Sequence, residues 1–194
     1  MLDFEGAKKY ILEKLKNELN PDLRYHSISH TIDVFNSATV LAALENVNGR
    51  NLILLQTAAL YHDSGLLIKY KGHEDISVLI VRKTLPKYGY KEDDIEIISE
   101  MIMSTKIPQS PLTHLDQILS DADLDYMGRD DFFMNAMRLK HEWMDNGIIT
   151  SLKEWYIIQR DFLQKHNYFT TAAKKLRQEK KMIHLSQIKE LLAL

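Results

Sequence analysis

Cysteine is absent from this sequence of 194 residues, so disulfide bonds, a thiolate nucleophile and a cysteine-based zinc site are all excluded. Any metal ion must therefore bind to carboxylates and to histidine, of which there are eight. Glycine and proline are also scarce, with seven and four residues, so few tight turns are expected. This scarcity favours an all-α fold over a many-stranded β-sandwich.

An excess of either charge is lacking too, since 25 Lys and Arg oppose 27 Asp and Glu, for a net charge of −2. This balance does not suit a protein that coats nucleic acid or a membrane surface. No apolar run approaches the ~20 residues that span a bilayer. The N-terminal residues predict an amphipathic helix and lack the basic start and apolar run of a secretory signal. We therefore expect a cytoplasmic protein without a membrane or nucleic-acid partner, whose oligomeric state is left open.

Apolar residues recur at helical spacing along almost the whole chain. The expected helices cover about residues 4–20, 27–48, 52–62, 74–88, 93–105, 114–124, 130–145, 151–164 and 170–181, followed by a last segment, 183–194. No internal repeat, low-complexity tract or linker interrupts them. We predict one domain over 1–194, with a core of about 22–130 and the helices of 131–194 packed on it as an extension.

Two histidine-containing motifs suggest a metal site. In YHSISHTIDV, His26 and His30 are four residues apart, so on one helix they would lie on the same face. In LLQTAALYHDSG, His62-Asp63 ends an apolar helix, where a charged carboxylate is costly unless a cation or another partner binds it. The alternatives are two solvated histidines at a helix start, and an aspartate that caps the next turn beside a core histidine.

A third motif, ILSDADLDYMG, has aspartates at three alternate positions, 121, 123 and 125. Such a triplet is usually a solvated turn, but here it occurs in the same chain as the two histidine motifs. Imidazole and carboxylate ligands together suit manganese, iron, zinc, nickel or, with fewer imidazoles, magnesium. We expect a divalent metal ion of this group as the cofactor.

The order His…His-Asp…Asp, formed by His30, His62-Asp63 and Asp123, resembles the signature of the HD superfamily of metal-dependent phosphohydrolases. The surroundings YHxxxHTxDV, ALYHDSG and LxDADLDxxG are similar to those of the family's motifs, over about residues 25–130. The resemblance implies an all-α, single HD-domain helical bundle with a C-terminal helical extension. It also implies that these four residues bind the metal, with Asp123 preferred to Asp121 because it follows a small residue.

Two further positions gain roles from the resemblance. His26 lies where class I cyclic-nucleotide phosphodiesterases, distant members of the superfamily, have a histidine that protonates the leaving oxygen. The stretch KGHEDIS resembles the HExxS segment of bacterial HD proteins, which implies that His73 meets a second metal or a phosphate. Glu74 would hydrogen-bond a ligand histidine or begin a helix. The later histidines of two-metal members are missing, because their places read SGLL and IMSTKI, so we expect one tightly bound ion.

The resemblance implies hydrolysis of a phosphate ester or anhydride in a small, nucleotide-like substrate by a metal-activated water. Asp63 or Asp123 would orient that water, and His26 would donate a proton to the departing alkoxide. The candidates for phosphate contact are Lys69, Lys106 and Arg129. Two alternatives remain: an oxygenase on the same scaffold, which needs two irons, and a non-catalytic nucleotide-binding module with a vestigial metal site.

Overall fold

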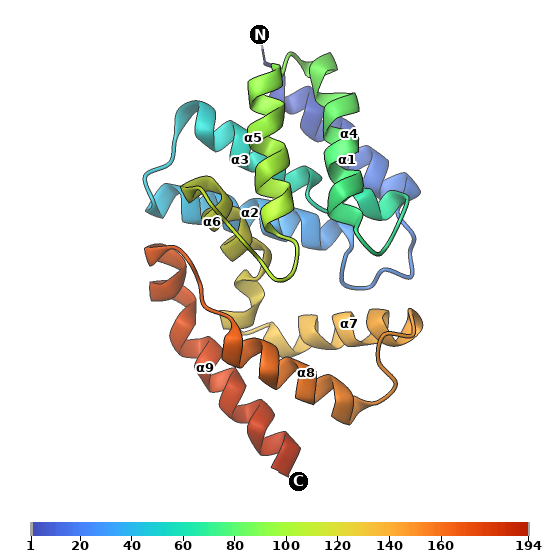
Figure 1. Ribbon diagram of the computed structural model, residues 1–194, viewed down its shortest axis with the longest axis vertical. Coiled ribbons are helices and arrows are strands. Elements are labelled where there is room, and N and C mark those ends of the chain that lie inside the picture. Colours follow the sequence, from blue (N-terminus) through green and yellow to red (C-terminus); the bar gives the residue numbers. More distant parts are fainter. Residues whose placement is uncertain (1, 194) are drawn as a thin grey trace.

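The structure is a computed structural model that describes residues 2–193, and every regular element within that range is helical (Figure 1). Its α-helices are α1 (Phe4–Glu18), α2 (Ile28–Leu44), α3 (Gly49–Tyr61), α4 (His73–Thr84), α5 (Glu92–Ser104), α6 (His114–Asp123), α7 (Phe132–Asp145), α8 (Leu152–Lys165) and α9 (Thr171–Ala193). Three short 3-10 helices are η1 (Ser64–Leu67), η2 (Leu85–Tyr88) and η3 (Asp125–Gly128). The predicted all-α fold is confirmed.

Local signals in the sequence account for several helix starts. Asp3 precedes α1, and its carboxylate accepts a hydrogen bond from the backbone N–H of Gly6 at 2.9 Å. Thr113 and Asp116 form a reciprocal capping box at the start of α6. The Ser151 side chain caps α8 by accepting a hydrogen bond from the backbone N–H of Glu154. These caps satisfy backbone donors that a helix start otherwise leaves without partners.

The C-terminal end differs from the expectation of a helix over 170–181 and a separate last segment. The structure has one continuous helix there, α9. No glycine or proline occurs between its ends, so nothing in the sequence stops it. Leu185 and Ile188 continue the buried side of the helix beyond residue 181. The apolar face of the last segment therefore extends the same helix.

The helices fall into two groups, with α1–α6 in the upper part of Figure 1 and α7–α9 in the lower part. The apolar interior is divided in the same way: one cluster is formed mainly by α1–α6 and a second by η3 and α7–α9. Tyr168 and Ala173, from the C-terminal part of the chain, belong to the first cluster, whereas Tyr25 belongs to the second. The two groups therefore pack directly on each other, around the segment that precedes α2.

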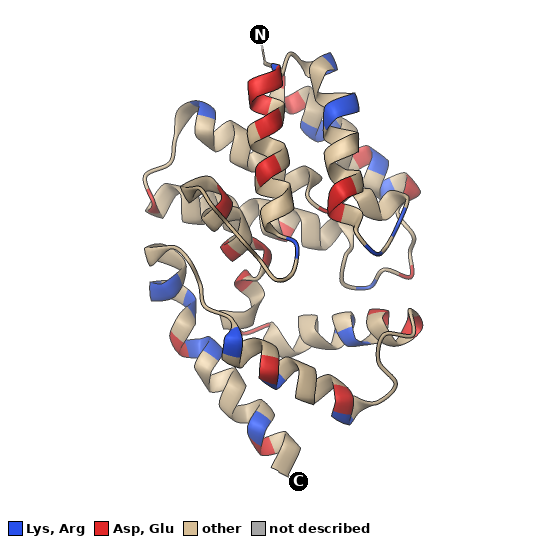
Figure 2. Ribbon diagram, in the orientation of Figure 1, with Lys and Arg blue, Asp and Glu red and all other residues tan. Residues whose placement is uncertain are grey.

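Both charge signs are spread over the helices, and basic residues are frequent along α9 (Figure 2). Several of these basic side chains bind within the chain. Arg177 donates to Asp125 at 2.6 Å, Lys180 pairs with Asp130, and the buried Lys181 donates to the carbonyl of His166 at 2.5 Å. Within residues 2–193, no helix is both long enough and apolar enough to cross a membrane.

Gly65 allows η1 and α4 to approach each other closely. A Cβ atom at this position would lie 1.9 Å from the carbonyl oxygen of His73, so only glycine fits. The backbone N–H of Gly65 also donates to the Ser77 hydroxyl at 2.8 Å. This contact holds the start of α4, with His73, beside Asp63 at the end of α3.

Candidate metal centre

The four predicted ligands come together where three helices meet: His30 in the first turn of α2, His62 and Asp63 after α3, and Asp123 at the end of α6. The Nε2 atom of His30 lies 3.2 Å from Asp123 Oδ1 and 3.5 Å from Asp63 Oδ2. The Nε2 atom of His62 lies 3.2 Å from Asp63 Oδ2 and 3.5 Å from Asp123 Oδ1. His30, His62 and Asp123 offer ligand atoms that all lie within 4.8 Å of one another. Each imidazole thus faces both carboxylates.

The hydrogen bonding of His62 shows which of its nitrogens is available. Its Nδ1 lies 2.8 Å from the carbonyl oxygen of Ala59, so the Nδ1 atom is the donor in a neutral ring and Nε2 carries a lone pair. Nε2 of His62 and Oδ2 of Asp63 are buried and have no hydrogen-bond partner. Two electron-rich atoms at this distance are stabilised by a cation between them. The residues therefore fit a divalent metal ion.

His73 shows the same arrangement on the other side of Asp63. Its Nδ1 lies 3.0 Å from the carbonyl oxygen of Tyr70, and its Nε2 lies 3.1 Å from Asp63 Oδ1. Asp63 thus has imidazoles at both of its oxygens. Glu74 does not hold the ring of His73, because its Oε1 atom is 3.9 Å from Nε2 and its buried Oε2 atom has no partner. The structure places His73 and Glu74 beside the four predicted ligands, where their side chains add further atoms that could bind a metal.

The electrostatics of the cluster favour a bound cation. Burial raises the pKa values of Asp63 and Asp123, but the histidines lower them by more, so both carboxylates are ionised at neutral pH. For His62, burial lowers the pKa, and the negative charge of Asp63 raises it well above the ordinary value. For His73, burial is likewise outweighed by Asp63, which raises the pKa to about 9. The field that attracts a proton to these nitrogens also attracts a metal ion, which competes with the proton for the lone pair.

His26 and His30 do not share a helix, so the argument from their spacing on one helix does not apply. Helix α2 begins at Ile28, and its N-cap Ser27 is extended. The backbone N–H groups of Tyr25 and His26 bind a carboxylate on α7 instead of a helical partner. Nevertheless, the ring centroid of His26 lies 5.8 Å from that of His30, so tertiary structure brings the side chain to the cluster.

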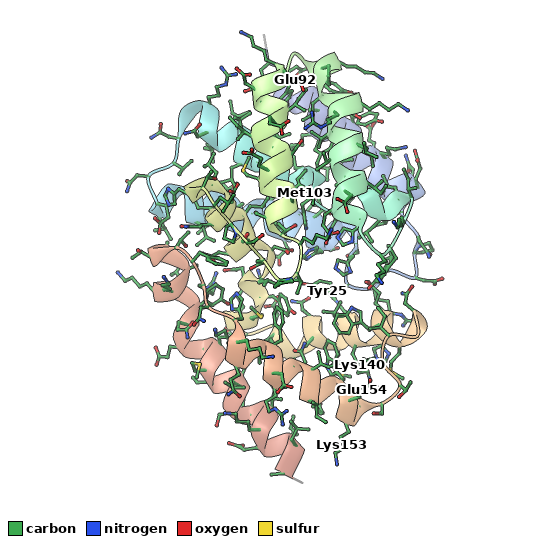
Figure 3. The ribbon with its side chains drawn as sticks, viewed as in Figure 1. Tyr25, Glu92, Met103, Lys140, Lys153 and Glu154 are labelled. Atoms are coloured by element: carbon green, nitrogen blue, oxygen red, sulfur yellow. The ribbon has the colours of Figure 1, made fainter. Side chains whose placement is uncertain are left out.

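The carboxylate that holds His26 is Glu142, which sequence reasoning missed. Its side chain is 0% exposed, and it accepts hydrogen bonds from the backbone N–H groups of Tyr25 and His26 at 3.0 and 3.1 Å. It also accepts from the Tyr70 hydroxyl at 2.8 Å and makes a short hydrogen bond with His26 Nδ1. Figure 3 labels Tyr25 at the level where the two groups of helices meet. No local pattern could have revealed a partner 116 residues away in the sequence.

Glu142 and His26 shift each other's ionisation in opposite directions. Burial lowers the pKa of His26, but the hydrogen bond with Glu142 and the charge of Asp63 raise it above the ordinary value. Burial raises the pKa of Glu142, and the hydrogen bond with His26 lowers it by more. These shifts favour an imidazolium beside a carboxylate, with Nδ1 of His26 held by Glu142 and Nε2 left to act as a donor.

The three predicted phosphate-contacting cations differ in their surroundings. Lys69 and Lys106 are exposed in the loops before α4 and after α5, and Lys106 donates to Asp75 at 3.2 Å. Arg129 is half-buried and donates to Asp33 at 2.8 Å through each of two nitrogens. It also donates to Asp131 at 3.0 and 2.7 Å. The charge of Arg129 is therefore already balanced by carboxylates.

Asp121 is engaged in structural hydrogen bonds. It accepts from the backbone N–H groups of Phe169 and Thr170, both at 2.8 Å, and from the Thr170 hydroxyl at 2.7 Å. Asp121 thus fixes the chain before α9, while Asp123, two residues later, faces the histidines. This arrangement agrees with the preference for Asp123 over Asp121 as a candidate ligand.

Comparison with known proteins supplies the family and the fold. The model of the HD domain family matches residues 27–127, just over half of the chain. A protein of Clostridium beijerinckii named only as uncharacterized is 31% identical over 104 residues, which cover 52% of this chain and 66% of that relative, just under two thirds of its length. The crystal structure of a predicted HD superfamily hydrolase from an uncultured Thermotogales bacterium is similar in fold, with a TM-score of 0.61 and 21% identity over 97% of this chain and 91% of the other.

Proposed function

This chain belongs to the HD domain family, and from that premise we propose that it is a metal-dependent hydrolase of a phosphate ester or anhydride in a small, nucleotide-like molecule. The observation that carries the proposal is the convergence of His30, His62, Asp63 and Asp123, in which the buried His62 Nε2 and Asp63 Oδ2 lie 3.2 Å apart and have no hydrogen-bond partner. The similar Thermotogales protein is described as a predicted hydrolase, which agrees with this proposal.

The ligands proposed for the metal are His30, His62, Asp63 and Asp123. A divalent ion bound there would supply Lewis-acid activation of water and of a phosphoryl group. The hydrogen bond of His62 to Ala59 orients its ring and keeps its Nε2 lone pair on the side of the cluster. His73, whose Nε2 atom lies 3.1 Å from Asp63 Oδ1, would bind a second ion or a phosphate oxygen.

In this proposal His26 is the proton donor. Glu142 fixes the ring through Nδ1 and stabilises its protonated form, so that the Nε2–H group serves the leaving oxygen. Such a donor contributes about 10²–10⁴ in rate when the leaving group is a poor one. Asp63, which remains ionised, would accept a hydrogen bond from the attacking water and orient it.

The test combines metal analysis with phosphate release. We expect the protein as purified to retain about one divalent ion or more per chain. With manganese added, it should hydrolyse at least one member of a nucleotide and phosphodiester panel, detected as released phosphate for monoesters and anhydrides and as the product monoester for diesters. His26→Ala should reduce the rate of release without loss of metal. His114→Ala is the matched control, because His114 is exposed and pairs with Glu45 on the surface.

Three results would count against the proposal. A protein that retains no metal after gel filtration and hydrolyses no member of the panel would contradict it outright. Oxygen uptake with added iron, without phosphate release, would instead support an oxygenase on the same scaffold. Tight nucleotide binding without turnover would indicate a binding module.

A further inference from the structure

A polar cavity of about 200 Å³ lies beside the candidate metal centre, between the start of α2 and the first half of α7. It is lined by Tyr25, Ser27, Ser29, His30, Asp33, Tyr126, Arg129, Asp131, Asn135 and Arg138. His30 is shared, because its side chain lines this cavity and its Nε2 atom faces Asp123 in the metal centre. A molecule in the cavity would therefore lie next to the proposed site of the chemistry.

Two carboxylates on the cavity wall are held in place by one guanidinium. Arg129 binds Asp33 through two hydrogen bonds of 2.8 Å, and it binds Asp131 through two of 3.0 and 2.7 Å. Such paired contacts fix the carboxylates and leave lone pairs on their oxygens free to accept further hydrogen bonds. A phosphate or carboxylate in the same cavity would meet two negative groups whose only shared cation is already bound. These acceptors suit a ligand that donates hydrogen bonds.

The remaining polar groups of the wall include both hydrogen-bond acceptors and hydrogen-bond donors. Asn135 donates to Asp131 at 2.9 Å, and its carbonyl oxygen receives only a long contact of 3.4 Å from Arg138. Arg138 forms no ion pair with a carboxylate of residues 2–193, so it keeps donors for a ligand. The Ser27 hydroxyl does not cap α2. Groups of both kinds, closely spaced, match hydroxyl groups, which donate and accept at once.

We infer that this cavity binds the sugar or another polyhydroxyl part of the substrate, while its phosphate lies at the metal centre. The inference rests on the proposed function, whose substrate class it narrows to phosphorylated sugars, including the ribose of nucleotides. The volume is that of about six or seven waters at ~30 Å³ each, which is the size of one sugar ring. Asp131 and Asn135 would recognise the hydroxyl groups and act through binding rather than through chemistry.

The experiment compares the binding of two phosphate esters, ribose 5-phosphate and phenyl phosphate, by calorimetric titration with magnesium present. We expect Asp131→Asn to weaken ribose 5-phosphate about tenfold, the effect of losing a hydrogen bond to a charged group, and to leave phenyl phosphate unchanged. The matched control is Asp130→Asn, because Asp130 is the neighbouring residue, is exposed and pairs with Lys180 on the surface. This control should change neither affinity. If Asp131→Asn does not fold, Asn135→Ala should show the same selective loss.

The outcomes separate this inference from the proposed function. Equal loss of both ligands in Asp131→Asn, or loss of neither, overturns the role of the cavity. Asp123→Asn should weaken both ligands, because both phosphates lie at the metal. A protein that hydrolyses no member of the nucleotide and phosphodiester panel but shows the selective effect of Asp131→Asn would retain the sugar site and lose the hydrolase proposal. A hydrolase that lacks the selective effect would support the proposed function and overturn the sugar site.

Discussion

The substitution Glu142→Gln tests whether Glu142, on α7, supports catalysis by holding the proposed proton donor His26. It preserves the shape of the side chain and removes its charge. In the wild type, one carboxylate with 0% exposure accepts from two backbone N–H groups, the Tyr70 hydroxyl and the His26 ring. A glutamine carbonyl can still accept from the backbone groups, but its NH₂ group then faces donors from His26 and Tyr70. The ring must change its tautomer or move.

The expected loss of activity follows from the ionisation of His26. Glu142 contributes to the raised pKa of that ring, so without its charge the pKa falls. A smaller fraction of His26 is then protonated. For substrates with alkoxide leaving groups, kcat should therefore fall by about 10²-fold, which is near the lower end of the effect of general-acid catalysis. p-Nitrophenyl esters, whose leaving group needs no proton, should lose less than about threefold, because their reaction gains little from a general acid.

The pH profile gives a second, independent measurement. The proton donor is active only while protonated, so the rate falls as the pH rises through the pKa of His26. Because the wild-type pKa is raised, this alkaline limb should move to lower pH in Glu142→Gln. Loss of charge-assisted hydrogen bonds should also lower the free energy of unfolding by about 2 kcal/mol, or Tm by about 4–8 °C. Part of this loss is offset, because burying a carboxylate is itself costly.

The control is Asp145→Asn, on the same helix one turn further along. Asp145 also reaches across to the N-terminal segment, through an exposed ion pair of 3.5 Å with Arg24, so its loss should change neither kcat nor the pH profile. The reasoning is refuted if Glu142→Gln keeps the wild-type alkaline limb, or if it slows good and poor leaving groups equally. Either result would reduce Glu142 to a structural contact.

Four further predictions concern the metal, a buried carboxylate and the effect of pH on stability. Removing divalent ions with a chelator should lower Tm, and metal at 100 times its Kd should restore about 2.7 kcal/mol; an unchanged melting curve would contradict a site in the folded state. Asp123→Asn should abolish metal retention in elemental analysis, and its Tm should fall to about that of the chelated wild-type protein. Asp121→Asn should retain the metal and cost about 1–3 kcal/mol in urea unfolding, because it weakens the buried hydrogen bonds to Thr170. Burial and the charge of Lys181 lower the pKa of His166 to about 3, below its unfolded value of about 6.5. The neutral ring therefore contributes its full stability above pH 6.5, and this contribution declines as the pH falls toward 3. His166→Phe should flatten this decline in thermal melts between pH 7 and pH 4, and an equal slope in both proteins would count against it.

The sequence alone determined the helical class and the elements of the metal centre. Helical periodicity and the scarcity of glycine and proline predicted an all-α chain, and the caps at Asp3, Thr113 and Ser151 explain several starts from local chemistry. The candidate ligands were recognisable because each stands in a short motif. Their order along the chain resembles that of a known family, whose model matches the same region.

Other features were decided only by tertiary structure. The position of His26 depends on Glu142, and the bonds between them span 116 residues, too far for any local pattern to report. Arg129 directly follows the motif ILSDADLDYMG, but the motif does not reveal that Asp33 and Asp131 bind the guanidinium. Periodicity reports which face of a helix is apolar, because that property is local. It does not report which charged groups meet across two helices, because that depends on how the helices pack.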